Sequence, residues 1–180
     1  GLELSETELL HQCIFMLNAG HETSTNMLSH GLNELINHRD QYKLLQKEPG
    51  RIDTAIDEIL RFQPPIQINN RRCLEKTKLG DVVVPEGTSV HMIIAGANRD
   101  PLQFFEPETF DISRSPNRHL SFGLGIHICA GINLARVEAK VAFQSLMSSF
   151  REINLLKEPN VADRIRFREI REMQIEVSSF

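Results

Sequence analysis

The stretch Phe122-Gly123-Leu124-Gly125-Ile126-His127-Ile128-Cys129-Ala130-Gly131 decides how the rest of this 180-residue sequence is read. Its glycines permit positive φ angles and a close approach of the backbone, so that amide N–H groups can be directed at a thiolate. The following residues, Ile132 to Phe150, have a helical pattern. A helix that begins just after Cys129 places the positive end of its dipole near the sulfur and favours the thiolate. The stretch therefore predicts a reactive cysteine, either a metal ligand or a nucleophile.

Composition indicates one ordinary globular domain over residues 1–180. The sequence is 41% apolar and 24% charged, with a net charge of −4 and dispersed basic residues, which argues against nucleic-acid binding. No apolar run reaches the roughly 18 residues that span a bilayer, and the first ten residues lack a signal-peptide pattern. Three widely spaced cysteines fit a reducing compartment. We expect a soluble, cytoplasmic protein with no membrane segment.

The first third of the chain predicts helices. Ser5 and Glu8 have the spacing of a capping box, and an apolar periodicity runs from there to about Asn37. Prolines end the later elements, because a proline removes a backbone donor and clashes with the preceding turn. The expected helices are residues 5–37, a shorter helix from the turn at 37–40 to Lys47, and residues 51–62.

The middle of the long helix is unusual. Residues 19–25 are polar, include Gly20 and carry three hydroxyl side chains, which can bond back to helix carbonyls and bend the axis. Two readings stay open at this point. The stretch is either a solvent-exposed segment with a tolerated glycine or an interruption that marks a functional site.

Glu58 and Arg61 form a second polar feature, three residues apart on the expected third helix. They lie on the polar side of a clean apolar stripe. Taken locally, the spacing predicts a solvated ion pair that contributes only about 0.2–0.5 kcal/mol.

The helical periodicity of the sequence ends at Pro64-Pro65. Short extended segments are expected at 66–70, 82–84 and 88–94, with turns at 85–87 and 98–101, and an irregular segment then reaches the cysteine loop. After the helix that begins at Ile132, partial alternation over 165–177 suggests a terminal hairpin. The predicted class is therefore mainly α with a small β component, an α+β fold.

Three kinds of chemistry suit a cysteine in such a loop. Zinc would use His127 and Cys129, but the sequence has no partner pair at zinc spacing. A cysteine nucleophile would need a histidine base such as His127, yet it would explain neither the polar helix centre nor the pair Glu58 and Arg61. The third possibility is haem iron with an axial thiolate.

For this third possibility the sequence resembles the cytochrome P-450 family of haem-thiolate monooxygenases, particularly its soluble bacterial members. Three motifs occur in the family's order, and two further segments, 97–101 and 116–122, also read like it. The motifs are Ala19-Gly20-X-Glu22-Thr23 for oxygen activation in the long I helix, Glu58-X-X-Arg61 of the K helix, and Phe122-X-X-Gly125-X-His127-X-Cys129-X-Gly131 for haem binding.

The resemblance implies a role for each matching residue. Cys129 would be the proximal iron ligand of haem b, with backbone amides of the Gly125 loop tuning the thiolate and Phe122 shielding it from water. Gly20 and Thr23 would accommodate and hydrogen-bond dioxygen, while Glu22 would relay protons. Glu58 and Arg61 would be a buried structural pair. The residues placed like those that hold the haem propionates are Arg71, His119 and His127.

The implied activity is the insertion of one oxygen atom from O₂ into a small organic substrate, with electrons from a ferredoxin or flavodoxin and its NAD(P)H reductase. Two departures accompany the resemblance. Thr109 stands where the family usually has an arginine or histidine, so that water or another side chain is expected to close the network around Glu58 and Arg61.

The second departure is length. Family members are about twice as long, and the chain corresponds to their C-terminal half, from the I helix to the C-terminus. We therefore expect a truncated form, a fragment or one part of a split protein whose N-terminal half, or a second chain, completes the haem cleft. The alternatives are a non-catalytic haem-binding or sensory protein and a haem-free remnant.

Overall fold

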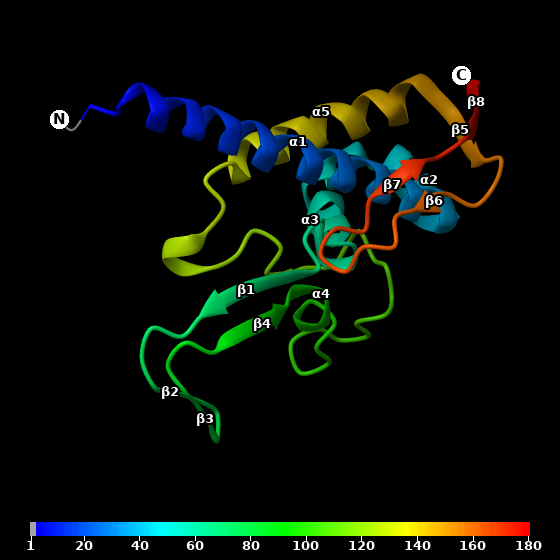
Figure 1. The fold of residues 1–180 in the computed structure, drawn as a ribbon. Coiled ribbons are helices and arrows are strands. Elements are labelled where there is room, and N and C mark those ends of the chain that lie inside the picture. Colours follow the sequence, from blue (N-terminus) through cyan, green and yellow to red (C-terminus); the bar gives the residue numbers. More distant parts are fainter. Residues whose placement is uncertain (1–2) are drawn as a thin grey trace.

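A computed structural model describes the fold of residues 3–180 (Figure 1). It is helix-rich with short strands, as predicted. The helices are α1 Glu6–Asn37, α2 Arg39–Lys47, η1 Pro49–Arg51, α3 Ile52–Phe62, α4 Ile94–Ala97, η2 Gly125–His127 and α5 Ile132–Ser149. The strands are β1 Ile68–Arg72, β2 Thr77–Leu79, β3 Val82–Val84, β4 Ser89–Ile93, β5 Phe150–Leu155, β6 Asn160–Val161, β7 Ile170–Glu172 and β8 Ile175–Ser179.

Helix α1 begins where the capping box predicts. The Glu8 carboxylate accepts from the Ser5 amide at 2.8 Å, and the Ser5 hydroxyl accepts from the Glu8 amide at 3.3 Å. The helix then continues to Asn37 without interruption. The hydroxyls of Thr23 and Thr25 donate to carbonyls four residues back, at 2.6 and 2.9 Å. The polar residues 19–25 therefore remain part of one continuous helix.

The core lies where the C-terminal half of α1 meets α3 and α5. Its fully buried side chains include Leu35, Ala55, Ile59, Ala139, Phe143 and Ile153. Gly31 allows the close approach of these helices, because a Cβ built there would lie 2.6 Å from Phe143 Cζ. Packing of apolar stripes, more than helix propensity, therefore sets the arrangement of the helices.

The strands form four separate two-stranded antiparallel sheets: β1 with β4, β2 with β3, β5 with β8, and β6 with β7. The predicted terminal hairpin is wrong. Strands β7 and β8 do not pair with each other; β8 returns to β5, with Ile153 opposite Val177, and β7 pairs with β6. The alternation of apolar and polar residues near the C-terminus predicted extended chain correctly. Such a pattern does not indicate which distant strand pairs with it.

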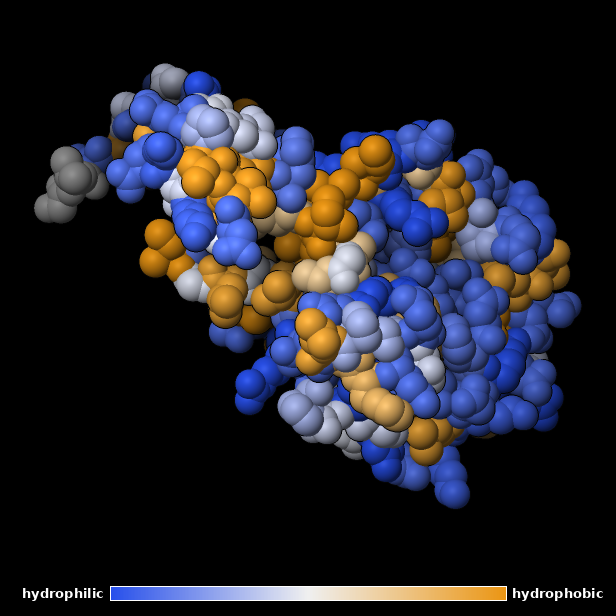
Figure 2. Space-filling view, turned by 90° about the horizontal axis from the view of Figure 1, so that it is seen from below, coloured by the Kyte–Doolittle hydropathy of each residue, from blue (hydrophilic) through white to orange (hydrophobic). Residues whose placement is uncertain are grey.

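The N-terminal half of α1 extends beyond the core as an arm (Figure 1). Hydrophobic side chains gather on this arm and continue as a band toward the middle of the face in Figure 2. The exposed apolar residues of the arm are Leu9, Leu10, Ile14, Phe15, Met16 and Leu17. A large exposed apolar surface marks a binding site or an interface. Among the helices of residues 3–180, none is both long enough and apolar enough to cross a membrane.

Candidate haem-binding site

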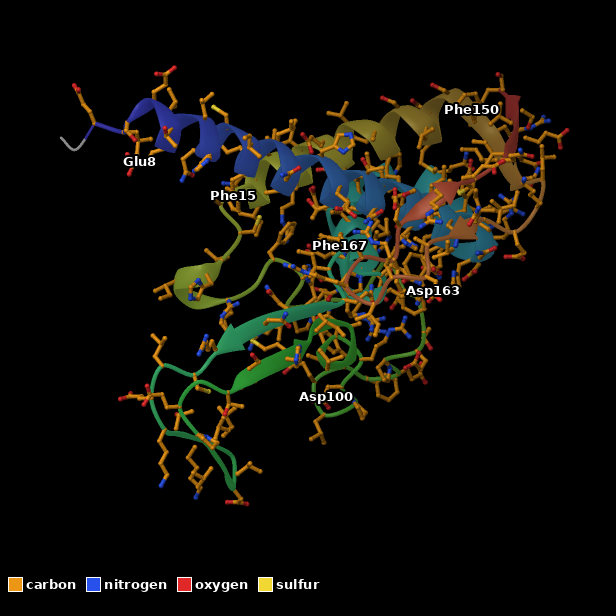
Figure 3. The ribbon with its side chains drawn as sticks, in the orientation of Figure 1. Glu8, Phe15, Asp100, Phe150, Asp163 and Phe167 are labelled. Atoms are coloured by element: carbon orange, nitrogen blue, oxygen red, sulfur yellow. The ribbon has the colours of Figure 1, made fainter. Side chains whose placement is uncertain are left out.

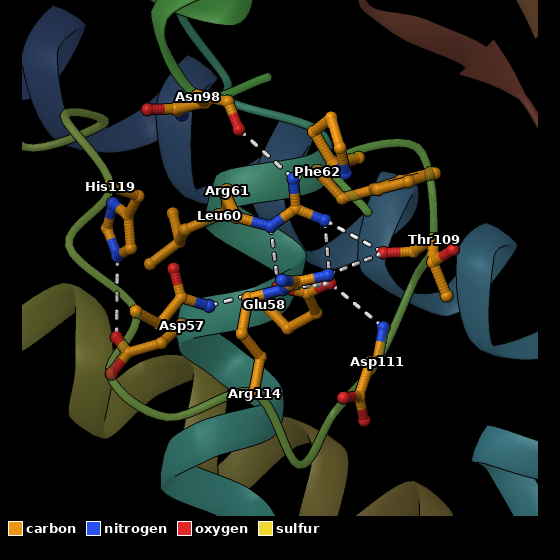
Figure 4. A network of polar contacts seen from close by, with 12 residues as sticks. Asp57, Glu58, Leu60, Arg61, Phe62, Asn98, Thr109, Asp111, Arg114 and His119 are labelled. Atoms are coloured by element: carbon orange, nitrogen blue, oxygen red, sulfur yellow. Dashed lines mark hydrogen bonds and ion pairs between the residues drawn. The ribbon is translucent and has the colours of Figure 1, made fainter. Parts of the chain in front are cut away.

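Glu58 and Arg61 lie at the centre of a buried polar network (Figure 4). Both side chains are 0% exposed, so the expectation of a solvated pair drawn from helical spacing is wrong, while the buried pair implied by the resemblance is what the structure contains. Arg61 meets the carboxylate through two hydrogen bonds, of 2.7 and 2.8 Å. Its other three N–H groups donate to the carbonyls of Asn98, Pro107 and Thr109. All five donors of the guanidinium are thus satisfied.

The Glu58 carboxylate gathers further donors from the irregular segment that follows. It accepts from the Asp111 amide at 2.9 Å and the Asn117 side chain at 3.0 Å, and Arg114 Nε lies 3.2 Å away. Thr109 contributes only its carbonyl, which accepts from Arg61 and Arg114. Another side chain, Arg114, therefore closes the network at the place where the threonine departs from the family pattern.

Asn98 fixes the chain just ahead of the cysteine loop. This side chain is fully buried; its amide donates to the Ser121 hydroxyl at 2.9 Å, and its carbonyl accepts from the Leu120 amide at 2.8 Å. The Ser121 hydroxyl in turn donates to the Leu60 carbonyl of α3 at 2.6 Å. Satisfied buried networks of this kind rigidify the segments they join. The loop is therefore held against α3 at its entry.

His119 is also committed to α3. Its side chain is 4% exposed and lies 3.4 Å from an Asp57 carboxylate oxygen, while Arg136 of α5 lies 2.6 Å from the same oxygen. Burial raises the pKa of Asp57, but the hydrogen bond from His119 and the charge of Arg136 outweigh it and hold that pKa below its usual value. The imidazole of His119 is thus buried, partnered by Asp57 and close to the Phe122 ring.

The cysteine loop lies between the arm of α1 and strand β1 (Figure 1). The Cys129 amide donates to the Phe122 carbonyl at 2.8 Å, which closes the loop. Gly123 and Gly125 have φ angles of 75° and 67°, and a Cβ at Gly123 would lie 3.0 Å from the His127 carbonyl. These two positions require glycine. Helix α5 then begins at Ile132, with Gly131 as its N-cap.

The sulfur sits at an open apolar surface. Cys129 is exposed, as are the neighbouring side chains of Leu124, Ile126 and Ile128. A Cβ at Gly131 would lie 3.9 Å from Cys129 Sγ, so the start of α5 approaches the sulfur closely. Within the described residues, the Ala130 and Gly131 amides donate to no backbone carbonyl. An exposed thiol with apolar flanks and nearby unpaired amides fits an axial ligand of a flat, largely apolar group such as haem.

The polar centre of α1 supplies the other predicted residues. A Cβ at Gly20 would meet nothing within 4 Å, so the helix surface there is open. Glu22 forms an ion pair with Arg164 at 3.1 Å, and the Ser24 hydroxyl donates to Glu138 of α5 at 2.8 Å. The Ser24 contact brings this turn of α1 beside the first half of α5, the helix that follows Cys129.

Two basic residues complete the predicted set. Arg71 is exposed on β1, where its guanidinium donates to the adjacent Asn70 carbonyl at 2.9 Å, and His127 is exposed at the end of η2. Both therefore have side chains available to an anionic group such as a propionate. Across residues 3–180, no group of three His, Cys, Asp or Glu side chains is arranged to hold a metal ion.

The residues around Cys129 are compatible with a haem-thiolate site, and the comparisons identify the family. A sequence model of the cytochrome P-450 family matches residues 1–163. The chain belongs to the cytochrome P-450 family. It is 40% identical over 153 residues to the biotin biosynthesis cytochrome P-450 of Bacillus subtilis and 38% identical over 152 residues to 6-deoxyerythronolide B hydroxylase of Saccharopolyspora erythraea.

Solved structures agree with this assignment. The BioI cytochrome P-450, solved with an acyl carrier protein ligated to hexadec-9Z-enoic acid, superposes with a TM-score of 0.96 at 38% identity. The polyketide synthase cytochrome P-450 PksS of Bacillus subtilis superposes with a TM-score of 0.94 at 34% identity.

The alignments cover most of this chain but less than half of each relative. The two matched relatives are covered over 39% and 38% of their length, while 85% and 84% of this chain is aligned. The two structures are covered over 47% of their chains, with 99% of this chain aligned. The chain thus spans less than half the length of these relatives.

Sequence reasoning missed several residues that hold the site together. Arg114 and Asn117 bond to Glu58, Asn98 bonds to Ser121, and Arg136 pairs with Asp57. Asn98 and Asn117 lie inside the two segments that resembled the family, 97–101 and 116–122. That resemblance was the sequence signal that could have identified them as partners of Arg61 and Glu58. Arg136 and Arg164 had no local signal, because their partners are distant in sequence.

Proposed function

We propose that this chain is the haem-binding C-terminal part of a haem-thiolate monooxygenase, with Cys129 as the axial ligand of haem b. The observation that carries the proposal is the exposed thiol in a glycine-constrained loop, anchored to α3 through Asn98 and Ser121. Haem bound there supplies the iron at which dioxygen is activated. The chain's own residues position it, exclude water and move protons.

On the proximal side we propose that Phe122 and the Gly125 loop shelter the sulfur and present amides to it. Arg71 and His127, both exposed, are suited to bind the propionates. The imidazole of His119 is engaged with Asp57, so its contribution to cofactor binding is to hold the loop in place. This assignment differs from the propionate role that the resemblance implied for His119.

On the opposite side we propose that the open surface at Gly20 leaves room for dioxygen. Thr23 would present its hydroxyl there, and Glu22 would carry protons toward it. In this structure the Thr23 hydroxyl donates to the Ala19 carbonyl, so its oxygen remains available as an acceptor. Glu22 is partly exposed and can exchange protons with solvent.

The proposed reaction takes an organic substrate R–H, O₂, two electrons and two protons to R–OH and water. The electrons would come from a ferredoxin or flavodoxin reduced by an NAD(P)H reductase. Named hydroxylases and monooxygenases among the relatives support this reaction type. The substrate would be a small organic molecule.

The test is the carbon-monoxide difference spectrum of the reduced protein. We expect a thiolate-type Soret band that is lost in Cys129→Ser and retained in Cys13→Ser, because Cys13 is an exposed thiol outside the loop. Product formation from O₂ and NAD(P)H, absent in Thr23→Ala, would establish catalysis. A well-folded sample without any haem band would contradict the proposal.

We further propose that tight haem binding requires an N-terminal portion of the fold. The apolar arm of α1 and the apolar side chains beside Cys129 are exposed in this chain, so the surface proposed to hold haem is open to water. A haem titration of the 180-residue chain followed at the Soret band should show weak uptake. Tight stoichiometric uptake with coupled turnover by this chain alone would contradict this part of the proposal.

A further inference from the structure

The turn between β6 and β7, residues 162–169, reaches across to the polar centre of α1. Arg164 Nη1 in this turn lies 3.1 Å from Glu22 Oε1 and 3.5 Å from Glu169 Oε2. The two partners Glu22 and Arg164 are 142 residues apart in sequence. Figure 3 shows Asp163 and Phe167 of the turn below α1, on the same side as β1. A side chain from the C-terminal region therefore contacts the glutamate proposed to move protons.

The turn that carries Arg164 is itself anchored. The Arg166 carbonyl accepts from the Gln67 amide at 2.9 Å, the Ala162 amide donates to the Glu169 carbonyl at 2.7 Å, and the His30 imidazole bonds to the Arg168 carbonyl. The turn is thus tied to the chain before β1, to its own far side and to α1. Arg164 also packs over the Phe167 ring, 5.7 Å from its centroid. These contacts hold in place the turn from which Arg164 reaches Glu22.

Stability does not account for this ion pair. The side chains of Arg164 and Glu22 are 48% and 35% exposed, and solvent screening leaves such exposed pairs little effect on stability. Orientation is a more substantial effect. A free glutamate side chain samples many rotamers, so an ion pair with Arg164 restricts the positions that its carboxylate occupies. Proton transfer depends steeply on such positioning.

Arg164 also borders a hollow of about 520 Å³. The turn forms one wall of it with Ile165 and Arg168, and the chain around β1 and β4 forms the other with Ile68 and Ile93. Arg164 therefore both lines this hollow and contacts Glu22. Its guanidinium can hold the carboxylate on the side of α1 that the turn faces.

We propose that Arg164 is a positioning residue that holds the Glu22 carboxylate for proton delivery. The inference rests on the proposed monooxygenase function. Arg166 provides a matched control, since it lies two residues away and packs over the same Phe167 ring at 5.3 Å. The ion pairs found in the described residues join Glu22 to Arg164 and not to Arg166.

The contact itself is tested first, without turnover. The carboxyl ¹³C resonance of Glu22 is measured in the labelled protein. Arg164→Gln should shift this resonance, because the nearest cation is removed, whereas Arg166→Gln should leave it unchanged. An unchanged resonance in Arg164→Gln would overturn the proposal, whatever the activity of the variant.

The functional test measures product formed per NAD(P)H oxidised in the haem-loaded protein, in the form that sustains turnover. Arg164→Gln should lower this ratio about tenfold, which is less than the 10²–10⁴-fold contributed by a general acid–base group itself. Arg164→Lys should give a ratio between those of Arg164→Gln and the unmodified protein, because lysine keeps the positive charge but lacks the planar guanidinium with its paired N–H donors. The variant Arg166→Gln should match the unmodified protein.

Glu22→Gln and the double variant decide whether Arg164 acts through Glu22. Adding Arg164→Gln to Glu22→Gln should cause no further loss, since residues that act together are not additive. Losses that multiply would overturn the proposal. If the protein turns over and Glu22→Gln has no effect, the positioning role fails while the monooxygenase function stands. A protein with neither haem nor turnover would overturn the proposed function itself.

Discussion

Arg61 shows how a charged residue is accommodated in a fully buried position. Its planar fork meets Glu58 with two hydrogen bonds and three carbonyls with the other N–H groups. Two aromatic rings, Phe62 and Phe104, lie 5.5 and 5.4 Å from the guanidinium carbon. Because a lysine offers only three donors from a single nitrogen, arginine is required by the geometry at this position.

The first prediction concerns this pair. Arg61→Ala leaves the Glu58 carboxylate buried with Arg114 as its remaining cationic partner, and should lower the free energy of unfolding by about 3–5 kcal/mol. Urea unfolding measures the change. Arg51→Ala is the control, because Arg51 and Glu48 have the same three-residue spacing but are 38% and 42% exposed. That variant should lose at most about 1 kcal/mol. Equal losses in the two variants would contradict the argument.

The second prediction concerns His30, which is buried in α1. Burial lowers its pKa, and the charge of Arg168 adds to this, while the bond to the Arg168 carbonyl and the charge of Glu34 act in the opposite direction. The unfolded chain, with a histidine pKa of about 6.5, therefore binds the proton more readily. The stability that this group contributes is present above about pH 6.5 and is lost as the pH falls below it toward the folded pKa.

The measurement is the free energy of unfolding at about pH 7.5 and about pH 5.5, on either side of the ordinary histidine pKa. It should fall less in His30→Gln than in the unmodified protein, because glutamine can donate to the same carbonyl without titrating. An identical decrease in both proteins would show that other groups account for the pH dependence.

At the scale of elements, α1 serves two different purposes along its length. Its C-terminal half packs in the core, where Gly31 lets Phe143 of α5 and Ile59 of α3 approach. Its central turns present polar groups and open surface instead, with Gly20 free of neighbours. Within one helix, Gly31 is therefore tightly packed against its neighbours, whereas Gly20 faces open space.

This contrast gives the third prediction. Alanine is favoured over glycine in a helix by about 1 kcal/mol. At Gly31 the added Cβ would lie 2.6 Å from Phe143 Cζ and 2.9 Å from Ile59 Cγ2, and both side chains are 0% exposed. Overpacking of this kind costs about 1–3 kcal/mol, so Gly31→Ala should lower the melting temperature. Gly20→Ala should raise it. Circular dichroism during heating measures both, and a higher melting temperature for Gly31→Ala would contradict the packing argument.

At the scale of the whole molecule, the distribution of apolar surface is uneven. The core is closed around Leu35, Ile59 and Phe143, while the arm of α1 exposes Leu10, Ile14 and other large side chains. The chain spans less than half the length of these relatives, and the open apolar surface supports the proposal that a further portion of the fold covers it.

The fourth prediction follows from this surface. Replacing Leu10 and Ile14 by lysine should reduce self-association and the binding of a hydrophobic dye, because these side chains are 56% and 57% exposed. The free energy of unfolding should change little. Leu35→Lys, at a position that is 0% exposed, should instead unfold the protein. Sedimentation and dye fluorescence measure the surface effect. Strong destabilisation by the two arm substitutions would show that the arm is part of the core.

The sequence by itself determined the local structure and the family. Capping by Ser5, the prolines at 49 and 64–65, and the glycines of the cysteine loop act over a few residues, so their consequences are readable from neighbours. The order of three motifs likewise identified the haem-thiolate resemblance, which the family comparison confirmed.

Tertiary structure alone decided the rest. The pairing of β8 with β5, the role of Arg114 in place of Thr109, the engagement of His119 by Asp57, and the reach of Arg164 to Glu22 all join residues far apart in the chain. Burial of Glu58 and Arg61 depended on where the segment from 98 to 117 folds back over α3. Local propensity specifies which residues form an element, but loop paths and packing select the partners, and those are properties of the whole fold.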